Sequence, residues 1–124
     1  MERSKVVLVV EDFDDIRDAM RILIELQGYQ VVEATDGREA INQAKETRPD
    51  LILMDLSMPA FDGIEATRQI KNDPQLQHIR IVAVTSHVGH YRDLALAAGC
   101  DRVIDKPDLL RDMEKLLTEL LNEV

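Results

Sequence analysis

The sequence predicts an α/β domain in which a doubly wound, five-stranded parallel sheet is covered by helices on both faces. Three observations lead to this prediction. Five short apolar runs recur along the chain, and segments with helical spacing of apolar residues separate them. Polar side chains follow several of the runs at the point where each predicted strand ends. An alternation of strand and helix favours a parallel sheet, because each crossover helix returns the chain to the same edge.

The predicted strands are β-branched or leucine-rich runs that are too short to form helices. They are Lys5–Val10, Gln30–Ala34, Leu51–Met54, Ile79–Val84 and Arg102–Ile104. The near-continuous apolarity of VVLVV, at residues 6–10, is typical of a strand covered on both faces.

Five helices are predicted between and after these strands. The first carries an apolar stripe of Ile16, Met20, Leu23 and Leu26 and stops at Gly28, a natural C-cap. The next three are expected over about Gly37–Thr47, Gly63–Asn72 and His90–Ala98. The last carries Leu109, Met113, Leu116, Leu117 and Leu120 at helical spacing. A proline or a glycine follows each of the middle three helices within a few residues, which is where a helix is expected to end.

The bulk composition indicates one globular domain spanning residues 1–124, with no linker, repeat or low-complexity stretch. A net charge of −9 repels phosphate backbones, so direct nucleic-acid binding is not expected. The longest apolar run, Val6–Val10, is far too short to cross a bilayer, and no membrane association is expected. Cys100 is the only cysteine, which excludes an internal disulfide and fits a reducing cytoplasm.

The chemistry-bearing residues gather at the predicted strand ends. Glu11 and Asp12 follow the first strand, Asp55 the third, Thr85 the fourth and Lys106 the fifth. In a flavodoxin-like sheet of order 2-1-3-4-5 the winding reverses between strands one and three, where ligands bind. Two unit charges about 4 Å apart repel by roughly 4 kcal/mol at an effective dielectric of about 20. Three carboxylates at one edge therefore need a cation, and hard oxygen ligands suit Mg²⁺.

Four stretches carry a more specific resemblance. They read VVLVVEDFDDIR, LILMDLSMPAFDGIEATRQIK, IVAVTSH and AAGCDRVIDKP. In order and spacing they resemble the receiver domain of response regulators, and the match covers essentially the whole chain. The segment from Asp55 through Met58-Pro59 to Asp62-Gly63, together with Lys106-Pro107, is its strongest part. The resemblance implies a CheY-like fold and a part in two-component signalling.

The resemblance also implies a role for each residue at the strand ends. Asp55 would be phosphorylated to 4-aspartylphosphate, Thr85 would contact a phosphoryl oxygen, and Lys106 would pair with the carboxylate or the phosphoryl group. The bond between Lys106 and Pro107 would be cis. The implied Mg²⁺ ligands are Glu11, Asp12, Asp55 and the backbone carbonyl of Ser57.

A protein of this kind accepts a phosphoryl group from a histidine kinase or a histidine phosphotransfer protein. Its activity would be limited to self-catalysed phosphotransfer to Asp55 and autodephosphorylation. We expect a stand-alone receiver that signals by contact with a downstream protein or by passing the phosphoryl group onward in a relay. One alternative is an unphosphorylated pseudo-receiver that serves as an interaction module. Another is a haloacid-dehalogenase-type phosphatase, but that family needs a second aspartate where Ser57 stands.

Several positions depart from the commonest receiver pattern. Val103 stands where an aromatic ring often reorients on phosphorylation, and a valine has no ring to move. The connection from Lys106-Pro107 into the last helix is expected to be short. Ser57 and His87 border the path of attacking water in the family, so they are expected to tune the phosphoryl lifetime. His87 and His90 are interpreted as solvated residues, because no third ligand lies nearby in the sequence.

Overall fold

The computed structural model describes residues 4–58 and 62–121. Its sheet has five strands, all parallel, in the order β2-β1-β3-β4-β5. The strands are β1 (Val6–Val10), β2 (Gln30–Ala34), β3 (Leu51–Asp55), β4 (Arg80–Thr85) and β5 (Arg102–Asp105). The predicted fold class and strand order are confirmed, and every predicted strand lies within one residue of its observed ends.

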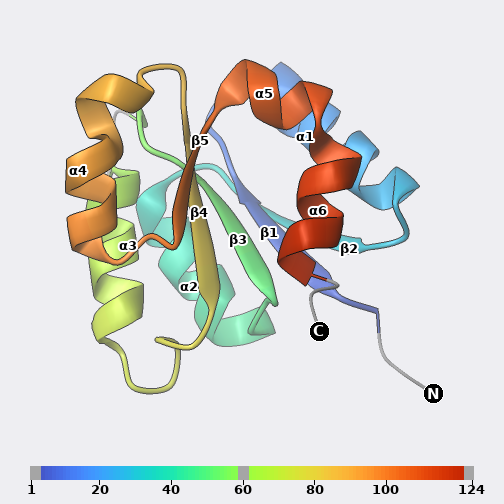
Figure 1. Ribbon diagram of the computed structural model, residues 1–124. Coiled ribbons are helices and arrows are strands. Elements are labelled where there is room, and N and C mark those ends of the chain that lie inside the picture. The colour runs from blue at the N-terminus through green and yellow to red at the C-terminus, as the bar shows by residue number, and fades with distance from the viewer. Residues whose placement is uncertain (1–3, 59–61, 122–124) are drawn as a thin grey trace.

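Helices cover both faces of the sheet (Figure 1). They are α1 (Asp14–Leu26), α2 (Gly37–Thr47), α3 (Gly63–Asn72), α4 (Val88–Ala98), α5 (Lys106–Arg111) and α6 (Met113–Leu121). Alternate strand residues point to opposite faces, which produces two core layers. Leu8 and Ile52 pack with α2, α3 and α4, whereas Val9 and Leu53 pack with α1, α5 and α6.

The predicted apolar stripe of α1 is wrong at its last position. Met20 and Ile24 are buried in the core, but Leu26 is 73% exposed. Leu26 is the last residue of α1, and the chain turns away at Gly28, which adopts a positive φ of 91°. Because an α-helix has about 3.6 residues per turn, Leu26 lies on a different side of α1 from Met20 and Ile24 and faces solvent.

The single last helix predicted from the leucine spacing is divided in two. Asp112 has φ −108° and ψ 22°, which lie outside the helical region and separate α5 from α6. The described residues thus form six helices rather than five. Aspartate competes for backbone hydrogen bonds and favours caps over helix interiors, which accounts for the break. The buried face nevertheless continues across the break, because Leu109, Met113 and Leu117 pack in the same core layer.

The connection into α5 is as short as the sequence predicts, since β5 ends at Asp105 and α5 begins at Lys106. No helix in the described part of the chain is long and apolar enough to span a membrane.

Candidate functional site

Three carboxylates converge at the carboxyl ends of β1 and β3. Glu11 and Asp12 directly follow β1, and Asp55 is the last residue of β3. These two strands are paired in the sheet, with Val10 opposite Met54, so their ends lie side by side. One oxygen from each of the three carboxylates lies within 4.8 Å of the others. The structure thus brings together the acids that the sequence places at the reversal point of the sheet.

A lysine from the end of β5 completes the cluster. Lys106 Nζ lies 3.0 Å from Glu11 Oε1 and 3.4 Å from Asp55 Oδ1. Both carboxylates are almost fully buried, Glu11 at 1% and Asp55 at 2% exposure. One ammonium therefore faces two buried carboxylates, and Asp12 adds a third negative charge that Lys106 cannot balance.

The ionisation of this cluster reflects its burial. Burial raises the pKa of the Glu11 carboxyl; the hydrogen bond from Lys106 opposes this effect, and the charge of Asp55 adds to it. For Lys106, burial lowers the ammonium pKa, but the hydrogen bond to Glu11 and the charges of Asp55 and Glu11 raise it above its usual value. The site therefore favours the charged form of Lys106, whereas burial disfavours the charged form of Glu11.

The donor set fits a small, hard divalent cation. Asp12 Oδ1 is buried and has no hydrogen-bond partner among the described residues. An unpartnered buried carboxylate oxygen is costly unless a cation or another group satisfies it. Carboxylate oxygens at one open strand edge are the ligands that Mg²⁺ takes in proteins, usually alongside several waters. Glu11, Asp12 and Asp55 could hold such an ion.

Backbone amides fix the orientation of two of these carboxylates. The amide of Phe13 donates to Glu11 Oε2 at 3.2 Å, and the amide of Ser57 donates to Asp55 Oδ1 at 3.1 Å. Ser57 therefore contacts Asp55 through its amide, and the role of its backbone carbonyl as an Mg²⁺ ligand stays a prediction. Pro59, which belongs to the same motif, lies outside the described residues.

Arg17 is a positioning residue to which the sequence analysis assigned no role. Its guanidinium donates to the Glu11 backbone carbonyl at 3.0 Å and also pairs with Asp14 and Glu33. It thereby ties the loop after β1 to α1 and to β2. An arginine one turn into a helix that follows an acidic loop is the signal that could have pointed to it.

Gly63 has a similar role on the other side of the site. It begins α3, and a β-carbon at this position would collide with the Asp55 backbone carbonyl and lie 2.9 Å from Met54 Cγ. The side chain of Asp62 caps the helix by accepting from the Glu65 amide at 2.8 Å. The Asp-Gly pair of the motif therefore lets α3 begin against the end of β3.

Thr85 is the last residue of β4 and is fully buried. Val84 lies opposite Asp55 in the sheet, so Thr85 extends one residue beyond that level. Its hydroxyl oxygen accepts a hydrogen bond from the His87 amide at 3.0 Å. Thr85 therefore connects the end of the sheet to the first turn of α4.

The expected cis bond between Lys106 and Pro107 is wrong for this chain, because the described residues contain no cis peptide. Pro107 instead lies in the first turn of α5, where its missing N–H costs no helical hydrogen bond. The direction of Lys106 is set by the abrupt change from strand to helix.

The remaining polar candidates do not join the site. Among the described residues, the group of three or more acids, histidines or cysteines close enough to hold a metal is Glu11, Asp12 and Asp55. His87 and His90 are exposed, as the sequence predicts. Cys100 is buried, with its sulfur 3.8 Å from the Thr67 hydroxyl, and burial raises its pKa.

These features define a class of protein. Residues 7–119 match the response regulator receiver domain, and the chain belongs to this family. Receiver domains are components of two-component signalling systems and are signalling proteins rather than enzymes in the ordinary sense.

Several known proteins are similar to this chain in sequence or in structure. The chain is 39% identical over 104 residues to the polar-differentiation response regulator DivK of Brucella anthropi, covering 83% of this chain and 85% of DivK. Among solved structures it resembles the receiver domain of the Pseudomonas aeruginosa sensor histidine kinase PA1611, which holds a magnesium ion in its active-site cleft. That match has a TM-score of 0.88 and 28% identity, over 98% of this chain and all of the other. The chemotaxis protein CheY4 of Vibrio cholerae matches with the same TM-score and identity, over 96% of this chain and all of CheY4.

Proposed function

We propose that the chain is a phosphoacceptor: Asp55 receives a phosphoryl group with the help of Mg²⁺ held by Glu11, Asp12, Asp55 and the Ser57 carbonyl. The observation that carries the proposal is the convergence of three carboxylates, of which Glu11 and Asp55 are buried and share the single ammonium of Lys106. One lysine leaves the cluster with an excess of negative charge, so a second cation must bind before a phosphate can approach.

The proposed reaction is a transfer from a phosphohistidine. A carboxylate oxygen of Asp55 attacks phosphorus, the P–N bond breaks, and the donor imidazole leaves with the electron pair. Bound Mg²⁺ would neutralise charge on the phosphoryl oxygens during this step. Lys106 supplies a second fixed positive charge, and the Thr85 hydroxyl donates a hydrogen bond to a phosphoryl oxygen.

The donor in this proposal is a histidine kinase or a histidine phosphotransfer protein, and the product signals through contact with a downstream protein. We assign these events to the cytoplasm and to a single receiver unit formed by residues 1–124. Family membership, the similarity to DivK and the magnesium site of the PA1611 receiver support this assignment.

The test is labelling with a small phosphodonor. Incubation with acetyl phosphate and Mg²⁺ should add one phosphoryl group per chain, measured by intact-mass spectrometry. EDTA should prevent the addition, and Asp55→Asn should remove it. Asp93→Asn makes the same chemical change at an exposed position of α4 and should label like the unmodified protein. Undiminished labelling of Asp55→Asn would reject the assignment of Asp55. No labelling of the unmodified protein by acetyl phosphate or by a phosphorylated histidine phosphotransfer protein would favour the interaction-module alternative.

A further inference from the structure

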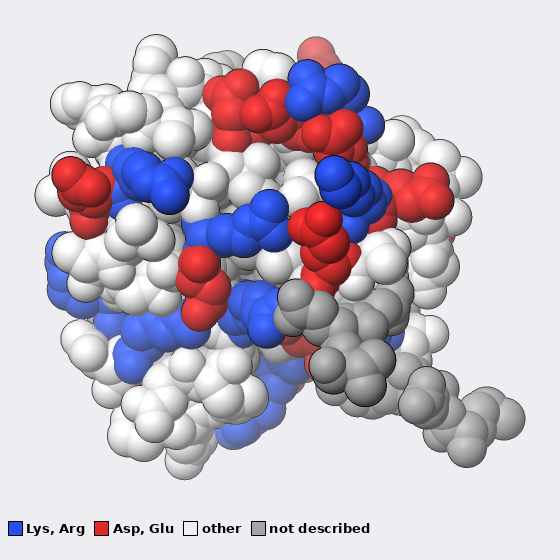
Figure 2. Space-filling model, in the orientation of Figure 1, with Lys and Arg blue, Asp and Glu red and all other residues white. Residues whose placement is uncertain are grey.

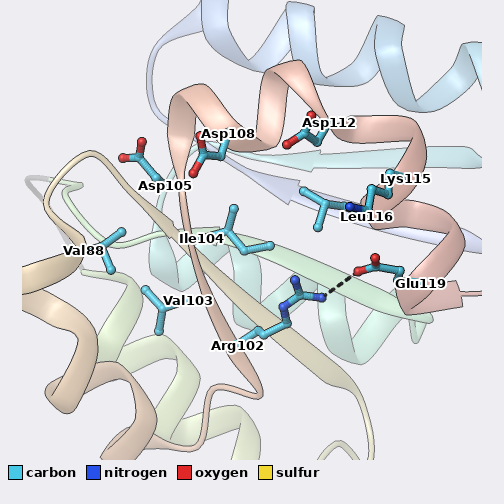
Figure 3. A pocket seen from close by; sticks show the side chains of 10 residues that line it. All are labelled: Val88, Arg102, Val103, Ile104, Asp105, Asp108, Asp112, Lys115, Leu116 and Glu119. Atoms are coloured by element: carbon cyan, nitrogen blue, oxygen red, sulfur yellow. Dashed lines mark hydrogen bonds and ion pairs between the residues drawn. The ribbon is translucent and has the colours of Figure 1, made fainter.

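The two edge strands of the sheet differ in their relation to the acidic site. On the side of β5, acidic and basic side chains are mixed over α5 and α6 (Figure 2). A hollow of about 510 Å³ beside β5 is likewise lined by both kinds, and such a mixture selects no partner by its charge (Figure 3). β2 forms the other edge and pairs with β1, whose carboxyl end leads directly into Glu11 and Asp12. A residue of β2 can therefore act on the site through the loop after β1.

The peptide group between Glu11 and Asp12 controls how two of the three acids are directed. A peptide group is planar, so the orientation of this plane is shared by the ψ angle of Glu11 and the φ angle of Asp12. Rotating the plane would turn both carboxylates relative to Asp55. The carbonyl oxygen of this peptide group, which belongs to Glu11, accepts a hydrogen bond from Arg17 Nη1 at 3.0 Å. Arg17 therefore holds the backbone group that joins two of the proposed Mg²⁺ ligands.

Two acids hold the Arg17 side chain in this position. Its Nη2 lies 2.6 Å from Asp14 Oδ1, at the start of α1, and its Nε lies 3.3 Å from Glu33 Oε1, in β2. The Asp14 side chain is 80% exposed, whereas the Glu33 oxygen is buried, so the contact with β2 is the sheltered one. The three nitrogens of one planar guanidinium thus reach three elements. A lysine carries the same charge on a single nitrogen, so it cannot reproduce this geometry.

Backbone hydrogen bonds fix the loop on either side of this peptide group. The amide of Glu11 donates to the Ala34 carbonyl at 3.1 Å, at the end of β2, and the amide of Phe13 donates to Glu11 Oε2 at 3.2 Å. The amide of Arg17 donates to the Phe13 carbonyl at 2.9 Å, which begins α1 and places the Arg17 side chain beside the loop. These bonds set the course of the chain, and the Arg17 side chain sets the direction of the carbonyl between them.

We propose that Arg17 sets the affinity of the site for Mg²⁺: it fixes the peptide plane between Glu11 and Asp12 in the orientation that binds the ion, and Glu33 of β2 holds it there. This inference rests on the proposed function, because it concerns the same Mg²⁺ site. Arg17 acts as a positioning residue and needs no contact with the ion. Its charge alone would oppose the binding of a second cation, and Asp14 and Glu33 offset that charge. The contact and the charge of Arg17 therefore predict opposite effects of its removal on Mg²⁺ binding.

The test measures the dissociation constant for Mg²⁺ by isothermal titration calorimetry of the unphosphorylated protein, at a temperature where each variant is folded. Arg17→Met and Arg17→Lys should each raise the dissociation constant about tenfold, the lower end of the range for residues that orient metal ligands. Arg17→Lys keeps the charge and is the milder change for the fold. Arg21→Met is the matched control: it removes the same charge one turn further along α1, where Arg21 pairs with Asp18, Glu25 and Glu33. It should leave the dissociation constant unchanged.

A second readout needs no metal. In EDTA the amide resonance of Asp12, which belongs to the same peptide group, should shift in both Arg17 variants and stay in place in Arg21→Met. Tighter Mg²⁺ binding by Arg17→Met would show that charge outweighs positioning and would overturn the inference. So would an unchanged dissociation constant in both Arg17 variants, even if they unfold at lower urea concentration, because that result describes a purely structural role. In these two cases the proposed function stands. An unmodified protein that binds no Mg²⁺ would reject the inference and the metal site of the proposed function together.

Discussion

At the scale of single residues, Lys106 balances two buried carboxylates and cannot balance a third. It lies within 3.4 Å of both Glu11 and Asp55, whereas Asp12 Oδ1 has no hydrogen-bond partner among the described residues. Removing a partner from a buried ion pair leaves an uncompensated charge, and this cost exceeds the value of the pair itself. The effects of substitutions here should therefore depend strongly on Mg²⁺.

Lys106→Met should lower the free energy of unfolding in EDTA by about 1–3 kcal/mol, because Glu11 and Asp55 lose their cation. The raised pKa of Lys106 means that its stabilisation is present at neutral pH and is lost only as pH rises above its usual value of 10.5. Millimolar Mg²⁺ should recover part of the loss. Urea denaturation at pH 7 with and without Mg²⁺ measures both effects, and Lys45→Met on α2 is the exposed control. Equal effects of the two substitutions would contradict the role assigned to Lys106.

In EDTA, Glu11→Gln should raise the free energy of unfolding, whereas Lys106→Met lowers it. The pKa of Glu11 is raised above 4.5 in the folded state, chiefly by burial, so the folded state binds its proton more tightly than the unfolded state does. Ionised Glu11 therefore lowers stability at pH 7, and this cost fades as pH falls toward 4.5. Thermal unfolding followed by circular dichroism should show a higher melting temperature for Glu11→Gln at pH 7 and little difference near pH 4. A lower melting temperature at pH 7 would mean that the Lys106 pair outweighs burial.

At the scale of elements, the site depends on how helices begin against strand ends. α3 begins at Gly63 against the carbonyl of Asp55, and α4 begins just after the His87 amide hydrogen bond to Thr85. The starts of α3 and α4 are therefore coupled to the positions of Asp55 and Thr85 at the carboxyl edge of the sheet.

Gly63→Ala should displace the start of α3 or the end of β3, because its methyl group would overlap the Asp55 carbonyl. We expect a loss of about 1–3 kcal/mol in unfolding free energy, typical of overpacking, and slower labelling by acetyl phosphate. Gly89→Ala is the matched control, since a β-carbon there meets no atom within 4 Å. Labelling rates for Gly63→Ala as fast as those for Gly89→Ala would show that this close contact does not position Asp55.

Phosphorylation should act first on the start of α4. The N-cap position of α4 is His87, whose side chain forms no capping hydrogen bond, and its amide is held by the Thr85 hydroxyl oxygen. If Thr85 moves toward a phosphoryl group, this amide must follow it or lose its partner. Beryllofluoride, which mimics the phosphoryl group, should therefore give large amide shifts over Thr85–His90 and small ones at Val103. Equally large shifts at Val103 and over Leu109–Met113 would show that the α5 side switches by another route.

At the scale of the whole molecule, a net charge of −9 and an acidic cluster at the sheet edge predict stabilisation by divalent cations. A ligand that binds only the native state adds RT ln(1 + [L]/Kd), or about 1.4 kcal/mol at a tenfold excess over Kd. The melting temperature should therefore rise with Mg²⁺ between 0 and about 10 mM. The gain should be much smaller for Asp12→Asn, and sodium at matched ionic strength should not reproduce it. A melting temperature insensitive to Mg²⁺ would count against the site.

The sequence by itself determined the class of fold and the position of the acids at strand ends, because apolar runs such as Val6–Val10 form strands and a residue placed just after a strand must lie at its carboxyl end. The strand order came instead from the flavodoxin-like topology that the resemblance to receiver domains implies. Because parallel strands end at a common edge, Glu11, Asp12 and Asp55 had to meet once the strand order was right.

Tertiary packing determined the contacts and helix boundaries that depend on residues distant in the chain. Arg17 donates a hydrogen bond to the Glu11 carbonyl, and the last predicted helix breaks at Asp112. The trans peptide before Pro107 and the hollow lined by Val103 and Ile104 of β5 also depend on such distant neighbours. Periodicity records which residues prefer burial, but it does not record how far an element extends over its neighbours or which polar atoms then come within hydrogen-bonding distance. Those distances are set when the helices pack on the sheet, so only the folded chain defines them.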